Sequence, residues 1–345
     1  MGAVLASSAS ATTWIVLPDG SGEFPDIQSA VDGAESGDVI ELGNGTFTGD
    51  GNRDVQIHDT SLTIRSQSGD PEACVLDCEA SAADPHRAFQ IENAPCVFEG
   101  FTVRRGEAPG TTYRAGGAIY GLQSDLHVLR CRFLDNHAQV GGAVTTLASQ
   151  VAFEDCLFSR NSAEVNNGAG GAIVLDGNSE IVRCTFVENE CGLGSAIAVS
   201  PGGVVRIDQC TLVGNLGDAI VAVGSPPEGA DALVSRTIVA FGQGRPFLCY
   251  FDGGRGFFSC SDLFGNSAGD WVDCLAEQAG EEGNLSADPL FCDPDAGDFQ
   301  LFSASPCAPL NNPTCGRIGA WDVGCGSVPV EETSWGRLKD VFRPD

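Results

Sequence analysis

The feature of this 345-residue chain that most constrains its fold is a short sequence word that recurs at nearly constant intervals. Four segments share the pattern C-x-[FL]-x-x-N, a fifth keeps its second half, and a sixth fits it without its Cys and Asn. In chain order these segments are residues 131–136, 156–161, 184–189, 210–215, 237–241 and 261–266. They follow one another every 25 to 28 residues. Self-similarity at a fixed period of this size predicts a repeat architecture.

A second word, G-G-A-[IV], runs in phase with the first. It opens at Gly116, Gly141 and Gly170, and variant copies open at Gly194 and Gly217. Between the two words lies a stretch of alternating apolar residues, which is typical of a β-strand. Three short strands in about 26 residues predict one coil of a parallel β-helix, whose coils stack at roughly 4.8 Å. The chain therefore belongs to the all-β class on this prediction.

Coil stacking explains the residues that the words repeat. Equivalent positions lie above one another, so we expect one column of Phe and Leu and a second column of Cys inside the core. The Asn residues are expected at a turn, where each amide can bond the backbone and the next Asn. The paired glycines allow a tight corner. The most visible residues of the repeat are thus predicted to be structural.

The two ends of the repeat carry signals of caps. Residues 24–34 have the apolar spacing of a short amphipathic helix, which would cover the first coil. Residues 333–344 show similar spacing at Trp335, Leu338 and Phe342, and they either pack back over the last coil or form a surface-retention tail. We expect a residual signal peptide at 1–11, an N-terminal cap at 12–37, the β-helix at 38–282, a closing segment at 283–326 and a tail helix at 327–345.

Several of these segments resemble a known group of proteins. The opening segment, residues 17–40, is similar to the start of right-handed parallel β-helix proteins of the pectin-lyase-like superfamily. The G-G-A-I and F-x-x-N words resemble those of bacterial polymorphic outer-membrane proteins and other secreted β-helix proteins, and residues 288–301 resemble their closing segments. The resemblance implies a right-handed parallel β-helix of roughly ten coils, with an N-terminal helical cap and a disulfide-rich C-terminal cap.

The cysteines and the first residues indicate an extracellular location. Fifteen cysteines fit an oxidising compartment, although the odd number leaves at least one unpaired. Residues 3–11 look like the tail of a signal peptide, and no stretch has the length of a membrane span. A zinc site is disfavoured because the chain contains no C-x-x-C motif. Candidate disulfide pairs are Cys74 with Cys78, Cys184 with Cys191, Cys249 with Cys260, Cys274 with Cys292, and two among Cys307, Cys315 and Cys325.

Charge restricts the partners of the chain and indicates one candidate binding region. Its 47 acidic and 18 basic residues give a net charge of −29, which excludes nucleic acid as a partner and favours a soluble monomer.

Residues 87–132 are locally basic, and they contain an insertion at about 106–115. Arginines in a groove there could hold uronate or sulfate groups bidentately. The alternative is that they pair with nearby acids. The ligand-binding candidates are Arg87, Arg104, Arg105 and Arg114.

A second candidate region is the acidic stretch at residues 270–299, which contains nine acids and no base. Oxygen-rich loops can bind Ca²⁺, although the spacing matches no EF-hand and no calcium repeat. The alternative is a solvated loop. The candidate calcium ligands are Asp288, Asp293, Asp295 and Asp298. No other cofactor is expected.

The resemblance implies three enzyme classes, namely polysaccharide lyase, glycoside hydrolase and pectin methylesterase. The sequence words typical of those enzymes are absent, and Arg245-Pro246 is only a fragment of the pectate lyase word. With 47 acids, pairs at glycosidase spacing arise by chance, so no catalytic residue is nominated. We therefore expect a secreted or cell-surface bacterial protein that recognises carbohydrate or has a structural role. The alternative is a polysaccharide lyase or glycoside hydrolase.

Overall fold

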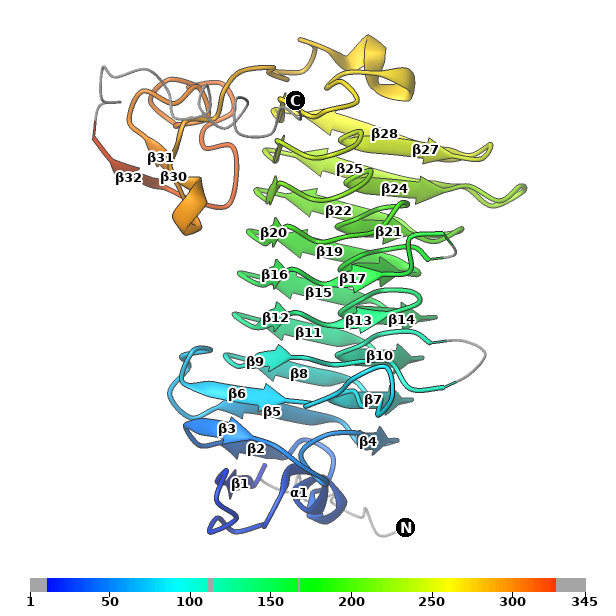
Figure 1. Ribbon diagram of the computed structural model, residues 1–345, viewed down its shortest axis with the longest axis vertical. Helices are drawn as coiled ribbons and strands as arrows, with labels where there is room; N and C mark the ends of the chain where they lie inside the picture. The colour runs from blue at the N-terminus through cyan, green and yellow to red at the C-terminus, as the bar shows by residue number, and fades with distance from the viewer. Residues whose placement is uncertain (1–10, 111–113, 167, 327–345) are drawn as a thin grey trace, which may run out of the picture.

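The fold is a long stack of short parallel strands (Figure 1). The structure is a computed structural model that describes residues 11–110, 114–166 and 168–326. Each coil contributes one strand to each of three sheets, and every strand pairs in parallel with its equivalent one coil further along. The repeat predicted from the sequence is therefore confirmed as a parallel β-helix.

We name the three sheets A, B and C. Sheet A contains β1 (Thr13–Val16), β2 (Val39–Leu42), β5 (Leu62–Ser66), β8 (Cys96–Glu99), β11 (Leu126–Leu129), β15 (Val151–Glu154), β19 (Asn178–Val182), β22 (Val204–Asp208), β25 (Ala230–Ser235) and β28 (Gly254–Ser259). Sheet B contains β3 (Gly45–Phe47), β6 (Cys74–Asp77), β9 (Thr102–Arg104), β12 (Arg132–Leu134), β16 (Leu157–Ser159), β20 (Thr185–Val187), β23 (Thr211–Val213), β26 (Ile238–Ala240) and β29 (Asp262–Phe264). Sheet C contains β4 (Val55–His58), β7 (Phe89–Glu92), β10 (Ile119–Leu122), β14 (Val144–Leu147), β18 (Ile173–Leu175), β21 (Ile197–Val199), β24 (Ile220–Val223) and β27 (Phe247–Tyr250).

Smaller elements complete the fold. The helices are α1 (Ile27–Gly33) and the 3₁₀ turns η1 (Asp273–Gln278) and η2 (Pro294–Ala296). The remaining strands are β13 (His137–Ala138), β17 (Ser162–Ala163), β30 (Phe291–Asp293), β31 (Asp298–Phe302) and β32 (Val323–Cys325).

The repeated Phe and Cys residues form columns in the core, as the spacing predicts. The rings of Phe133, Phe158 and Phe186 stack nearly parallel, with centroids 5.0 and 4.7 Å apart. The second column, Cys131, Cys156, Cys184 and Cys210, is almost fully buried. Burial raises the pKa of Cys156 and Cys184 well above its ordinary value, so these thiols stay protonated and unreactive.

The repeated Asn residues form a hydrogen-bonded ladder at one turn. The amide Nδ2 of Asn161 donates to Asn189 Oδ1 at 3.0 Å, and that of Asn136 donates to Asn161 Oδ1 at 2.9 Å. The glycines that open the second word have left-handed φ angles, for example +64° at Gly116 and +60° at Gly141. Both predicted roles, ladder and corner, are confirmed.

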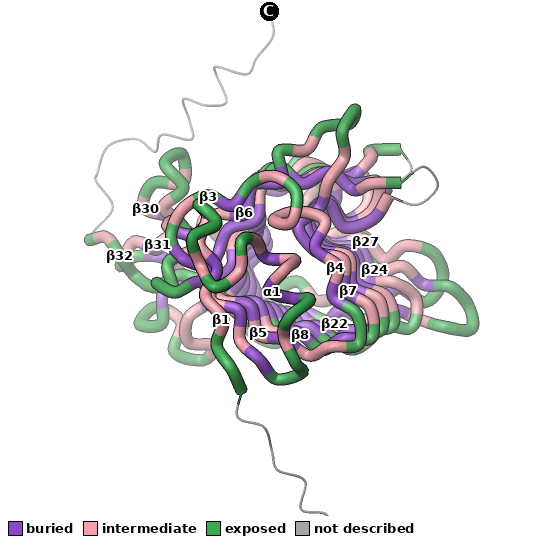
Figure 2. The backbone as a smooth tube through the Cα atoms, turned by 90° about the horizontal axis from the view of Figure 1, so that it is seen from below, coloured by how far each residue is buried: buried purple, intermediate pink, exposed green. Residues whose placement is uncertain are grey.

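The N-terminal end of the solenoid is closed by α1, which lies across the open end of the ring of strands (Figure 2). Ile27, Ala30 and Val31 of this helix are buried, and Asp26 caps it by accepting from the backbone N–H of Ser29. The helix is shorter than the predicted 24–34, and β1 of the same region already pairs with β2 in sheet A. Sheet A has ten strands, sheet B nine and sheet C eight, each from a successive coil of the solenoid.

The C-terminal end is closed by the chain around η1. Leu275 is fully buried, and Trp271 packs against the end of the main core. Gln278 satisfies the exposed edge of β28, because its Oε1 accepts from Phe258 N at 2.7 Å and its Nε2 donates to Gly256 O at 2.8 Å. This turn therefore protects an otherwise open sheet edge.

The predicted closing segment packs beside the solenoid (Figure 1). It lies against the outer face of sheet B, where its residues Phe291, Leu301 and Ile318 bury Ile238 and Val213. Three disulfides lie in this part of the chain, and they are Cys249–Cys274, Cys260–Cys315 and Cys292–Cys325. The candidate pairs proposed from sequence proximity are wrong, because stacking brings together residues one coil apart and loop residues that fold back.

A buried acid links the closing segment to the last coil. The Cys307 thiol donates to Asp262 Oδ2 at 3.2 Å, and Ala287 N donates to Asp262 Oδ1 at 3.0 Å. Burial raises the pKa of Asp262 to about 6, which is above the ordinary value of 3.8. The protonated form is therefore favoured in the folded state, so this stabilisation is complete below pH 3.8 and is lost as the pH rises through about 6.

Substitution of Asp262 should change how stability depends on pH. The Asp262→Asn variant has no ionisable group at this position. We expect its free energy of unfolding to gain about 2 kcal/mol relative to the natural chain between about pH 4 and pH 8. Urea unfolding of both proteins across this range measures the difference. Parallel stability curves would show that Asp262 does not titrate as the burial indicates.

Candidate functional site

Three of the four predicted ligand-binding arginines are engaged by acids of the chain itself. Arg104 Nε lies 2.8 Å from Asp77 Oδ2, and Arg105 Nε lies 2.7 Å from Asp77 Oδ1. Burial alone would raise the pKa of Asp77, but the hydrogen bond from Arg105 and both positive charges outweigh it and lower that pKa. Arg114 pairs with Glu107 at 3.1 Å and also with Glu164. These three arginines are thus paired with acids, which is the arrangement that the alternative expectation describes.

Arg87, the fourth candidate, has a different environment. Of the arginines that the structure describes, all but Arg87 and Arg206 have a carboxylate oxygen within 4.0 Å. The side chain of Arg87 is only 5% exposed, and its buried Nε has no hydrogen-bond partner. Burial lowers the pKa of Arg87, although a guanidinium remains charged near neutral pH. The charge of nearby Asp54 offsets part of the cost of burying this cation, and an anionic ligand bound directly by the guanidinium would reduce that cost further.

Arg87 lines a surface cavity of about 390 Å³. Gln90 of β7 and Tyr120 of β10 contribute from the outer face of sheet C, and Pro109, Gly110 and Ala115 contribute from the predicted insertion. The guanidinium carbon of Arg87 lies 5.3 Å from the centroid of the Tyr120 ring. This cation–π contact orients the guanidinium group. None of the described residues that line this cavity is acidic, which is unusual for a chain with a charge of −29.

The coil geometry before β7 fixes the backbone of Arg87. Asp54, in the coil before, accepts from Arg87 N at 3.0 Å and contacts His86 Nδ1 at 2.5 Å. The other ring nitrogen of His86 lies 3.2 Å from Asp84 Oδ1. Both nitrogens of His86 therefore face carboxylates, and His86 does not line the cavity. We assign His86 and Asp54 a positioning role rather than an acid–base role.

The chemistry that this arrangement favours is recognition of a planar anion beside an apolar or sugar surface. A guanidinium donates two parallel hydrogen bonds to a carboxylate, and the Tyr120 hydroxyl and Gln90 amide add polar groups nearby. The sequence indicated Arg87 and the insertion. It did not indicate Gln90 and Tyr120, although their outward positions at equivalent places in neighbouring strands are visible once the register of sheet C is known.

The predicted calcium ligands serve local backbone turns. Asp288, Asp293 and Asp298 each accept from a backbone N–H two or three residues ahead. In residues 11–110, 114–166 and 168–326, no group of three or more His, Cys, Asp or Glu side chains is arranged to hold a metal ion. The four aspartates are therefore not assembled into a site around a cation in this structure.

Comparisons with known proteins extend the structural result. The family model described as "Right handed beta helix region" matches residues 40–229, more than half of the chain. Metabotropic glutamate receptor-like protein Q of Dictyostelium discoideum is 32% identical over 125 residues, which are 36% of this chain and 10% of that protein. Protein R of the same organism is 30% identical over 126 residues, or 29% of this chain and 8% of that protein. The chain thus spans about a tenth or less of these relatives.

Solved structures show the same fold. The crystal structure of pectate lyase Pel9A has a TM-score of 0.54, and the match covers 92% of this chain and 97% of that chain at 13% identity. At this identity the likeness concerns the arrangement of strands and not the activity. No helix in the described part of the chain has the length and apolar character needed to cross a membrane.

Proposed function

Because this chain belongs to the right-handed β-helix family and has the pectin-lyase-like fold, we propose that it is a secreted or cell-surface module that binds an acidic polysaccharide. The ligand class follows from the cavity around Arg87, where a uronate carboxylate would receive the guanidinium fork. The extracellular location is supported by three disulfides, which form in oxidising compartments. The predicted signal-peptide residues 1–11 lie almost entirely outside the described residues.

The observation that carries the proposal is the missing partner of Arg87. Other buried or half-buried arginines of this chain are matched by acids, and the chain has acids in excess. Arg87 is the exception, and the described residues that line its cavity include no acid. The overall negative charge repels a polyanion at long range, so binding should depend on this local contact and on screening by salt.

Binding of galacturonate oligomers near physiological salt tests the proposal. The Arg87→Gln variant should bind them about 10 to 100 times more weakly in calorimetry, because charge-assisted hydrogen bonds contribute about 1.5–3 kcal/mol. Arg206→Gln is the matched control, because it removes the other unpaired arginine from sheet A and should leave binding unchanged. A Tyr120→Phe variant tests the pocket with little risk to folding. Equal affinity of Arg87→Gln and the natural chain would refute the site.

The alternative function is that of a polysaccharide lyase or glycoside hydrolase. His86 does not line the cavity, and none of the described residues that line it is an acid. These observations favour binding over catalysis. Incubation with the oligomers that bind separates the two, because a lyase produces an unsaturated product that absorbs in the ultraviolet and a hydrolase produces new reducing ends. We expect neither product.

A further inference from the structure

A second cavity lies on the outer face of sheet A, whereas Arg87 lies beside sheet C. It measures about 790 Å³ and crosses four neighbouring strands, β19, β22, β25 and β28. One wall is the turn around η1, which also closes the end of the solenoid. We call this cavity the sheet A groove. Nothing in the proposed binding of an acidic polysaccharide uses it.

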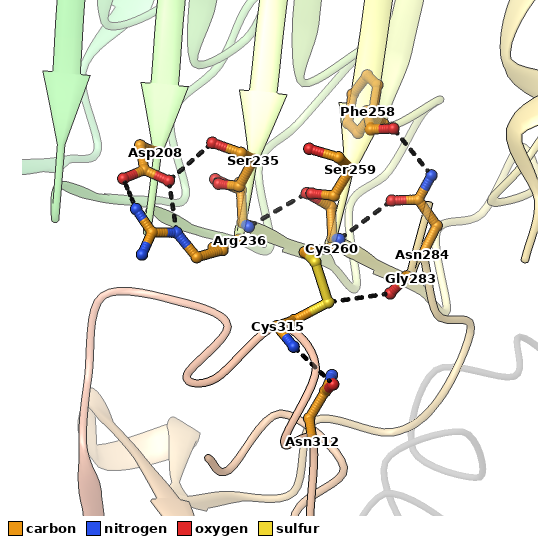
Figure 3. The surroundings of a disulfide bond; sticks show 12 residues. Asp208, Ser235, Arg236, Phe258, Ser259, Cys260, Gly283, Asn284, Asn312 and Cys315 are labelled. Atoms are coloured by element: carbon orange, nitrogen blue, oxygen red, sulfur yellow. Dashed lines mark hydrogen bonds and ion pairs between the residues drawn. A yellow bond between two sulfur atoms is a disulfide. The ribbon is translucent and has the colours of Figure 1, made fainter. Parts of the chain in front are cut away.

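The groove holds acids that have no basic partner. Glu180, Glu277, Glu281 and Glu282 line it, and in the described residues none of them has an arginine or histidine nitrogen within 4.0 Å. The remaining acid, Asp208, is paired with Arg236 through Oδ1 and Nε at 2.9 Å (Figure 3). Arg206 is the one lining base without a partner. Four free carboxylates against one free guanidinium give the groove a negative charge that favours a cationic occupant.

The floor of the groove is apolar. Leu233 and Phe257 are register partners on β25 and β28, and both side chains point away from the core. The Phe257 side chain is 47% exposed, and it is one of few large apolar residues exposed on the described surface. An occupant that combines positive charge with apolar or aromatic groups would pair with the acids of the groove and pack against its apolar floor.

A segment of the chain itself has this combination. Residues 333–344 contain Trp335, Leu338 and Phe342 at helical spacing, with three bases and one acid. Lys339 and Arg343 follow Trp335 by four and eight residues, so in a helix they would lie beside the apolar stripe. This segment lies outside the described residues. The rest of the chain is strongly acidic, which makes this segment the best match in charge to the groove.

The course of the closing segment brings the chain to the edge of the groove. Gly319 N donates to the backbone oxygen of Arg236, a residue that lines the groove, at 2.7 Å. The Cys260–Cys315 disulfide fixes the chain at the same edge (Figure 3). The described chain continues only to residue 326, and residues 327–332 can span about 20 Å when extended. After Gly319 the chain turns back into β32, which pairs with β31 and is joined to Cys292 through Cys325, so this span starts from the closing segment.

We propose that residues 333–344 occupy the sheet A groove of their own chain, with Trp335 and Phe342 on Leu233 and Phe257 and the bases facing Glu277, Glu281 and Glu282. This contact places the tail beside the last coils, and it also covers the exposed Phe257 ring and the unpaired acids of the groove. Sheet C and the Arg87 cavity are not involved. The proposal therefore stands or fails separately from the proposed function.

The single lysine of the chain provides a direct test. Lys339 is the only lysine among 345 residues, so a zero-length carbodiimide cross-link from it to a carboxylate has one defined donor. We expect mass spectrometry of digested full-length monomer to show Lys339 joined mainly to Glu277, Glu281 or Glu282. In the variant with Gln at these three positions, Lys339 can still be cross-linked to the other acids of the groove. The yield of these intramolecular links should fall about fivefold, because three exposed ion pairs contribute about 1 kcal/mol together.

A matched variant controls for loss of charge. Glu79→Gln, Glu228→Gln and Asp252→Asn together remove three exposed acids that also lack ion pairs among the described residues, and they do not line the groove. Cross-linking in this variant should equal that of the natural chain. Links from Lys339 spread equally over acids elsewhere, links only between two chains, or no link at all would each overturn the proposal. A Trp335→Ala and Phe342→Ala variant that keeps the full yield would also overturn it.

Discussion

Replacement of Asn161 by Ala should lower the free energy of unfolding by about 4 kcal/mol. The side chain is fully buried and makes four hydrogen bonds. Its Oδ1 accepts from the backbone and side-chain nitrogens of Asn136, and its Nδ2 donates to Phe133 O and Asn189 Oδ1. Alanine removes these four hydrogen bonds, which contribute about 1 kcal/mol each, and it leaves Asn136 N without its acceptor, whereas Asn136 Nδ2 keeps Val103 O and Asn189 Oδ1 keeps Asn161 N. The shift of the urea midpoint at constant slope measures the loss.

An exposed asparagine of the same solenoid is the control. Asn178 lies on the outer face of sheet A, and we expect Asn178→Ala to change stability by less than about 0.5 kcal/mol. A loss of less than about 1 kcal/mol for Asn161→Ala would mean that water or a backbone shift satisfies the orphaned groups. The ladder would then be a consequence of the fold and not one of its main supports.

The repeated words predicted the interior of this molecule because each word has one physical task. A Phe that recurs every coil can stack only on its equivalent, and an Asn that recurs at a turn bonds the next Asn. The positions of the columns follow from the period alone. Coil number and cap boundaries are less determined, because β1 and the first turn of α1 depend on contacts that no repeat encodes.

The candidate site was predictable only in part, for a related reason. The sequence shows how many arginines lie near the insertion but not which of them meets an acid from another coil. Arg104 and Arg105 meet Asp77 because sheet B aligns β6 with β9. No carboxylate oxygen of the described residues lies within 4.0 Å of the Arg87 guanidinium, and the strand residues that line the cavity with it are Gln90 and Tyr120. The pairing of cysteines is subject to the same limit, since Cys260 and Cys315 are 55 residues apart.

The irregular coil at residues 237–241 illustrates how a departure from the repeat can be structural. Thr237 takes the position of the missing Cys, and its Oγ1 accepts from Cys210 N at 3.2 Å. Ile238 and Ala240 of the same coil are covered by the closing segment. The coil that departs from the repeat is therefore one against which the closing segment packs.

Removal of the Cys260–Cys315 disulfide should release the closing segment from sheet B. The bond closes a loop of 55 residues, which corresponds to about 4 kcal/mol in the chain-entropy model. In a variant with Ser at both positions, the backbone amides of Gly319 and Ala320 should exchange about 10²–10³ times faster. These amides donate to Arg236 O and Thr211 Oγ1, so they report directly on docking.

A second disulfide variant shows whether the effect is local. Cys249–Cys274 joins β27 to η1 with a separation of 25 residues, and its replacement should leave exchange at Gly319 and Ala320 unchanged. If the Cys260 and Cys315 variant also leaves these amides protected, the apolar contacts of Phe291, Leu301 and Ile318 hold the segment without the bond. Faster exchange at Gly319 and Ala320 alone, with the core of the solenoid unaffected, would show that the closing segment unfolds as a separate unit anchored at Cys260.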